Sequence, residues 1–158
     1  MNIKKTANLL LNFAIKRIAE IFGIIIFGSG LLLLISLLSY SPDDPNFIFP
    51  DNTQIKNLLG FQGSFISDIF FQSVGLVSYL ISLTFLITGI NIFRTKEFFL
   101  FIENIFFVIL YSIFGTLFLT HFYSDIFTFY INGNGGFVGN YLNQTFLNSL
   151  ILLNENIF

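Results

Sequence analysis

Long stretches without a charged side chain dominate this chain. Three of them, at residues 21–42, 69–93 and 104–124, contain 22, 25 and 21 residues. A helix needs about 20 apolar residues to cross the roughly 30 Å hydrocarbon core of a bilayer. These stretches lack the alternation of barrel strands, so helix is the spanning structure that satisfies their backbone in lipid. The pattern predicts three transmembrane helices, preceded by segment 1–20 and joined by loops 43–68 and 94–103.

The uncharged stretch at residues 126–154 has a different pattern, because six side-chain amides between Asn132 and Asn148 and four glycines interrupt it. Over residues 138–149, apolar and amide side chains fall on opposite sides of a helix, which predicts an amphipathic helix at the membrane interface. The expected apolar side is Val138, Tyr141, Leu142, Thr145, Phe146 and Ser149, and the expected polar side is Asn140, Asn143, Gln144 and Asn148. We expect segment 125–158 to be an outer loop with an interfacial helix, truncated before a fourth transmembrane helix.

The distribution of basic residues predicts the orientation in the membrane, because cytoplasmic flanks carry the excess of Lys and Arg. Six basic residues lie in segments 1–20 and 94–103, and Lys56 alone lies in loop 43–68. The N-terminus is therefore expected in the cytoplasm, and segments 43–68 and 125–158 outside. A cleaved signal peptide is the alternative for the first apolar stretch, but that stretch is too long and lacks an A-x-A-like site.

Composition agrees with a membrane protein and excludes several kinds of site. Of 158 residues, 54% are hydrophobic and 10% charged, whereas soluble domains carry roughly 25% charged residues. The lack of cysteine and the single histidine exclude a disulfide framework, a thiol nucleophile and a histidine-cluster metal site. The sequence has no stripe of basic residues of the kind that contacts nucleic acid. We therefore expect no catalytic residue, cofactor or metal in this chain, and the lipid bilayer as its surroundings.

An acidic pair follows the first apolar stretch directly. With Ser41 as N-cap, Pro42 at the first helical position, and Asp43 and Asp44 next, the sequence predicts a short helical turn. The functional alternative is a paired-carboxylate acid/base or cation site, for which no third partner is evident.

Glycines before the second apolar stretch indicate a tight turn or close packing. Gly60 and Gly63 lie three residues apart, and Asp68 is expected in the first turn of the second spanning helix. The alternative role for Asp68 is an intramembrane proton carrier, which its position near the interface does not favour.

Small residues are spaced along the second apolar stretch, at Gly75, Ser78, Ser82 and Gly89. They predict a close helix approach, either within the bundle or between subunits. His121, near the outer end of the third stretch, is expected to be a snorkelling or capping imidazole.

The glycine-rich segment 133–139 precedes the expected interfacial helix. The dinucleotide-binding pattern G-x-G-x-x-G requires a glycine where this segment has Val138. A P-loop ends in Gly-Lys-Ser/Thr, which the segment lacks. We interpret it as a turn that redirects the chain, and not as a phosphate-binding loop.

Four motifs in this order resemble the N-terminal membrane domain of FtsK-family DNA translocases. They are LLSYSPDDPNF at 37–47, NLLGFQGSFISD at 57–68, FFQSVGLVSY at 70–79 and GGFVG at 135–139. The sequence departs from the family pattern at Phe47, where Trp is usual, and at Leu59, where Gly is frequent.

The resemblance implies a four-helix anchor in the bacterial inner membrane at the division septum, linked to a cytoplasmic hexameric ATPase that moves DNA during chromosome segregation. This chain contains no Walker A motif and no winged-helix DNA reader. The resemblance therefore implies anchoring, septal targeting among other septal membrane proteins, and self-association, without a motor. The alternative is a fragment of a small multi-pass transporter or channel, although such proteins place ionisable residues or broken helices at mid-membrane.

Overall fold

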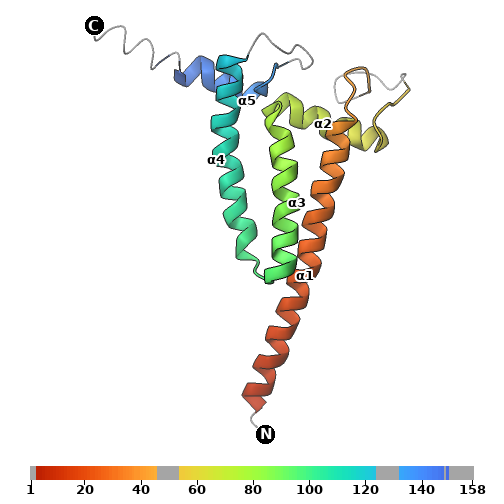
Figure 1. Ribbon diagram of the computed structural model, residues 1–158, viewed down its shortest axis with the longest axis vertical. Coiled ribbons are helices and arrows are strands. Elements are labelled where there is room, and N and C mark those ends of the chain that lie inside the picture. The colour runs from red at the N-terminus through yellow and green to blue at the C-terminus, as the bar shows by residue number, and fades with distance from the viewer. Residues whose placement is uncertain (1–2, 46–53, 124–131, 148, 150–158) are drawn as a thin grey trace.

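The computed structural model describes residues 3–45, 54–123, 132–147 and 149, and over these residues it is helical without strands (Figure 1). Its elements are α1 (Ile3–Leu38), α2 (Gly60–Val74), α3 (Val77–Thr95), α4 (Phe99–Phe122), α5 (Gly136–Leu142) and the π-helical turn η1 (Asn143–Leu147). Three stretches, Asn8–Leu38 within α1, α3 and α4, are long and apolar enough to cross a membrane. The predicted fold class, all-α with three spanning helices, is confirmed.

The three long helices run alongside one another, and the short helices α2 and α5 both lie at the same end of this bundle (Figure 1). We call this end the outer end, following the predicted orientation. The N-terminus lies at the opposite end, below the loop that joins α3 to α4 (Figure 1).

The second spanning helix differs from its predicted range of 69–93. Gly75 adopts φ +58°, a left-handed conformation that favours glycine, and ends α2 there, with its N–H bonded to the Phe71 carbonyl at 2.9 Å. Residues 69–74 therefore belong to α2, and the spanning helix α3 begins at Val77. Hydropathy missed this break because both sides of Gly75 are equally apolar.

α1 continues well beyond the bundle at the inner end. The Glu20 carboxylate pairs with Lys96 at 2.8 Å, just after α3, and with Arg17 one turn earlier at 2.5 Å. These pairs mark where α3 ends against α1. On the N-terminal side of the Glu20–Lys96 pair, α1 projects past α3 and α4 as an unbroken helix (Figure 1).

Close packing of α1 against α3 depends on glycine, as the small residues of the second stretch predicted. A Cβ on Gly23 would lie 2.7 Å from the Phe93 nitrogen, and one on Gly89 would overlap the backbone of Phe27. Ser78 and Ser82 are fully buried in the same helix. The expected close helix approach is confirmed within the bundle, where backbones meet with no side chain between them.

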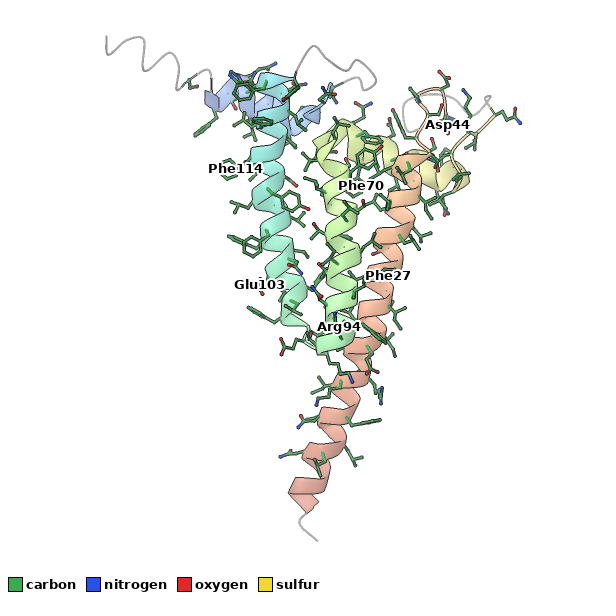
Figure 2. All side chains as sticks on the ribbon, in the orientation of Figure 1. Phe27, Asp44, Phe70, Arg94, Glu103 and Phe114 are labelled. Atoms are coloured by element: carbon green, nitrogen blue, oxygen red, sulfur yellow. The ribbon has the colours of Figure 1, made fainter. Side chains whose placement is uncertain are left out.

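α4 packs much less extensively than α1 and α3. Its buried residues are the polar Ser112, Thr116 and Thr120, whereas apolar side chains such as Phe114, 64% exposed, point outward (Figure 2). Two polar contacts join α4 to α3: Asn104 Nδ2 donates to Thr88 Oγ1 at 2.9 Å, and the hydroxyls of Thr84 and Tyr111 lie 2.9 Å apart. An apolar exterior around polar contacts is the arrangement expected of a helix in lipid.

Candidate functional site: the outer polar platform

Buried polar side chains gather at the outer end of the bundle, and we call this region the outer platform. It comprises the chain after α1, helix α2, the α2–α3 junction and segment 132–142. Among the described residues, no group of three or more His, Asp or Glu side chains is placed to hold a metal ion. Hydrogen bonds from the platform's side chains to distant backbone groups hold the chain in place.

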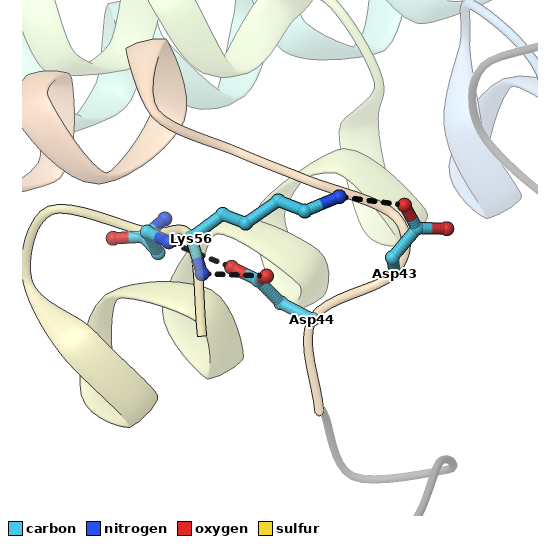
Figure 3. Close-up of polar contacts among 4 residues, drawn as sticks. Asp43, Asp44 and Lys56 are labelled. Carbon is cyan, nitrogen blue, oxygen red and sulfur yellow. Dashed lines mark hydrogen bonds and ion pairs between the residues drawn. The ribbon is translucent and has the colours of Figure 1, made fainter. Parts of the chain in front are cut away.

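Asp44 fixes the return of the chain toward α2 (Figure 3). Its side chain is 1% exposed; Oδ1 accepts a hydrogen bond from the Lys56 N–H and Oδ2 one from the Asn57 N–H, both at 2.8 Å. A carboxylate that receives two backbone donors makes strong, charge-assisted hydrogen bonds. The two ends of the segment between Asp44 and Lys56 are thus held together.

Asp43 points to a different partner, the Lys56 ammonium, with Oδ2 and Nζ 2.9 Å apart (Figure 3). The hydrogen bond and the opposite charge both raise the pKa of Lys56 above its ordinary value. Because Asp43 and Asp44 bind separate groups, they do not converge on a common acid/base or cation site.

The predicted turn at this acidic pair is present, but it does not form a capped helix. The structure has a single turn there, closed by the Asp44 N–H on the Ser41 carbonyl at 3.2 Å, and Ser41 caps no helix. The partners of Asp44 lie 12 and 13 residues later, a distance that no local capping rule covers.

Asn57 joins the end of α1 to the start of α2. Its Nδ2 donates to the Ser36 carbonyl at 2.9 Å, and its Oδ1 accepts from the Leu59 N–H at 3.1 Å. The Ser36 hydroxyl in turn donates to the Gly63 carbonyl at 2.5 Å. A Cβ on Gly63 would overlap Asn57 Oδ1, and Gly60 has φ +65°, which confirms the predicted close packing and tight turn at these glycines.

Asp68 lies inside α2 and not in the first turn of a spanning helix, which corrects the predicted position. It is 5% exposed and accepts hydrogen bonds from Tyr40 Oη at 3.3 Å and Gln72 Nε2 at 3.5 Å. The fully buried Phe71 ring packs beside it against the rings of Tyr40 and Tyr79.

The glycine-rich segment locks the α2–α3 junction to the outer end of α4. The backbone carbonyl of Asn134 accepts a hydrogen bond from the Leu76 N–H at 2.9 Å. The side-chain Nδ2 of Asn134 donates to the Tyr123 carbonyl at 2.7 Å. A Cβ on Gly75 would overlap the Asn134 carbonyl, and one on Gly136 would lie 2.6 Å from the Ser73 carbonyl. Segment 133–139 is thus a turn that joins three elements.

α5 docks on α4 through glycines, a contact that the predicted apolar and polar sides of this helix did not include. Cβ atoms on Gly135 and Gly139 would overlap the Thr120 hydroxyl, so the two backbones touch. The helix begins at Gly136, becomes π-helical at Asn143, and leaves Tyr141 and Phe146 exposed. Asn140, on the expected polar side, donates to the Asn132 carbonyl at 2.9 Å. Asn148 and residues 150–158 lie outside the described residues.

His121 is exposed in the last turn of α4, with its ring 4.7 Å from that of Phe122. Exposed aromatic rings also occur on α2 at Phe61 and on α5 at Phe137 and Tyr141. Amphipathic and aromatic side chains at this level are typical of the lipid–water interface.

Comparison with known proteins identifies the family. The family described as the 4TM region of DNA translocase FtsK/SpoIIIE matches residues 15–154. The DNA translocase FtsK of Rickettsia prowazekii is 31% identical over 134 residues, which are 85% of this chain and 18% of that protein. The DNA translocase FtsK of Rickettsia bellii is 38% identical over 49% of this chain and 10% of its own length. That of Caulobacter vibrioides is 36% identical over 46% of this chain and 9% of its own length.

The chain thus spans less than a fifth of the length of these relatives. No solved structure matches it. The match reaches from α1 to beyond η1, and so includes the three apolar helices and the outer platform. The chain belongs to the FtsK/SpoIIIE family of DNA translocases and corresponds to their membrane region.

Proposed function

We propose that this chain is the membrane anchor of a DNA translocase acting in cell division and chromosome segregation, and that it targets the protein to the septum and brings its subunits together. The observation that carries the proposal is the family match over residues 15–154, which covers α3, α4, the outer platform and α1 from residue 15 onward. In this proposal, ATP hydrolysis and DNA movement are carried out by other parts of such a protein.

The contacts between α3 and α4 favour an anchor over a transporter or channel fragment. Two pairs of polar side chains between these helices bond to each other, Asn104 to Thr88 and Thr84 to Tyr111. Transport pathways instead place ionisable groups or broken helices at mid-membrane.

The platform supports a role in recognition, because its hydrogen bonds fix the described backbone near the outer surface, at Lys56 and Asn57 and at Leu76. We propose that other septal membrane proteins are recognised on this side, where Asp44 and Asn134 fix the backbone. A preorganised surface binds with less loss of conformational entropy than a mobile one.

Localisation of a fluorescent fusion tests the proposal. The protein tag is joined to the N-terminus and the fusion is imaged in dividing bacterial cells, where enrichment at the septum is expected. The matched control is Asn134→Ala, which leaves the spanning helices intact and is expected to give an even signal around the membrane. An even signal from the unaltered chain would contradict septal targeting, and a cytosolic signal would contradict the anchor.

Two further measurements test subunit association and the absence of a motor. Copies carrying two different affinity tags should co-purify in detergent. The purified chain should show no ATPase activity and no salt-sensitive DNA binding, since phosphate contacts release counterions. Nucleotide-dependent turnover that follows the chain through purification would contradict the anchor.

A further inference from the structure

A cavity of about 420 Å³ lies under α2, between this helix and the two spanning helices α1 and α3. We call it the α2 groove. Its lining includes Ser29, Leu32 and Leu33 of α1, Gln62 and Ile66 of α2, and Phe85 of α3. The groove does not involve Asp44, Asp68 or Asn134, but it shares α2 and the Ser36–Gly63 hydrogen bond with the outer platform.

The walls of the α2 groove do not suit water. The hydroxyl of Ser29 donates to the Ile26 carbonyl at 2.8 Å, and that of Ser36, also in the lining, donates to the Gly63 carbonyl. Both hydroxyls are thus used by the backbone, and most other lining residues are apolar. A cavity with such walls stays dry or takes an apolar occupant.

The groove is continuous with the lipid-facing surface of the protein. Leu32, 55% exposed, and Ile66, 41% exposed, each belong both to the lining and to the apolar exterior. Hydrocarbon chains therefore surround the opening at this depth. The exposed Gln62 lies on the α2 side of the groove, where its amide can reach polar oxygens at the lipid–water interface.

The volume distinguishes a lipid chain from a protein helix. A helix about 10 Å wide with a 5.4 Å pitch occupies, in a single turn, about the volume of the whole groove. A flexible acyl chain enters through the open side and follows the space between α1 and α3. We propose that the α2 groove binds one acyl chain of a glycerophospholipid from the leaflet on the α2 side, with the headgroup near Gln62.

Native mass spectrometry of the full chain purified with phosphatidylethanolamine tests the proposal. The unaltered chain should retain one phospholipid after the surrounding detergent and loosely held lipid are removed. Ser29→Phe places a ring in the groove and should weaken this retention at least about tenfold, the effect of displacing two methylene groups. Gly28→Phe is the matched control, because a side chain there meets nothing within 4 Å, and should retain the lipid.

Fluorescence quenching supplies a second measurement that does not depend on the folding of Ser29→Phe. The chain contains no tryptophan, so Ile66→Trp and Leu31→Trp each introduce a single fluorophore. Both positions are 41% exposed, but only Ile66 lines the groove. With brominated phosphatidylethanolamine in mixed micelles, quenching at Ile66→Trp should saturate at a low lipid fraction, whereas quenching at Leu31→Trp should rise in proportion to it.

Each outcome decides the proposal. Equal lipid retention by Ser29→Phe and Gly28→Phe would overturn it, as would proportional quenching at both tryptophans. A dimer of the unaltered chain that Ser29→Phe alone dissociates would show that a second copy fills the groove, which also overturns the proposal. Lipid retention by the unaltered chain and Gly28→Phe alone, with early saturation at Ile66→Trp alone, would establish the acyl-chain site.

Discussion

The α1–α3 interface and the outer platform are both tightly packed, but different chemistry holds each of them. Gly23 and Gly89 let two backbones touch within the apolar part of the bundle. At the outer end, the side chains of Asp44 and Asn134 bond to backbone groups far along the chain. In lipid there is little hydrophobic gain from joining two helices, so close packing dominates there, whereas near water a loop must satisfy its backbone groups one by one.

The outer platform takes its name from the predicted orientation, in which its end of the bundle faces outward. Gln54→Cys should react with a membrane-impermeant maleimide in intact cells, and Thr95→Cys only after lysis, because basic residues flank the inner end. The chain has no native cysteine to contribute background. Labelling of Thr95→Cys alone in intact cells would invert the orientation.

The next largest effect is expected at the α1–α3 interface. Gly89→Leu should lower the free energy of unfolding by about 3 kcal/mol or more, because the new side chain meets the backbone of Phe27, which has no room to move aside. Unfolding in micelles titrated with denaturing detergent measures this. Gly28→Leu adds the same side chain where nothing lies within 4 Å and should not destabilise the fold; equal losses at both positions would refute the interface described here.

A somewhat smaller loss is expected on the outer platform. Asp44→Asn removes the charge that receives two backbone N–H groups and turns one acceptor oxygen into a donor, so the loss should be about 2 kcal/mol. The same unfolding measurement, with protease cleavage between Asp44 and Lys56 as a second readout, checks it. Asp43→Asn alters only the exposed pair with Lys56 and should leave both readouts unchanged.

The smallest effects concern the hydroxyls of Thr120 in α4 and Thr88 in α3, and they differ in sign. The buried hydroxyl of Thr120 has no hydrogen-bond partner among the described residues, so Thr120→Val should be neutral or stabilise by up to about 1 kcal/mol. Thr88→Val removes the acceptor of Asn104 and should destabilise by about 0.6 to 1.7 kcal/mol. Equal destabilisation by the two variants would mean that the Thr120 hydroxyl has a stabilising role that its contacts do not reveal.

The sequence predicted the bundle far better than the platform. Charge-free intervals predict spanning helices because the cost of charge in lipid is local to each residue, and small residues in 69–93 likewise indicated a close helix approach. The break at Gly75 and the partners of Asp44 depend on contacts between segments far apart in the chain. The glycine pair before α2 gave a correct signal because a tight turn is again a local property.

The asparagines of segment 132–148 also show that a local sequence pattern does not reveal contacts with other segments. A helical wheel separates amides from apolar residues, but it does not reveal whether an amide faces solvent or a neighbouring carbonyl. Asn134 and Asn140 face carbonyls of Tyr123 and Asn132, and glycines form the docking side of α5. The predicted polar side therefore did not show which amides bond to carbonyls where the chain folds back on itself.

The unbroken course of α1 has a mechanical consequence. This helix has 36 residues and no internal proline, so it forms a rod about 54 Å long. Its outer end is joined to the platform through Ser36, and its inner end projects past the last turn of α3 (Figure 1). Because α1 is held against α3 as far as the Glu20–Lys96 pair and continues as a stiff rod beyond it, a tilt of the bundle displaces the projecting inner tip, with no change of conformation between them.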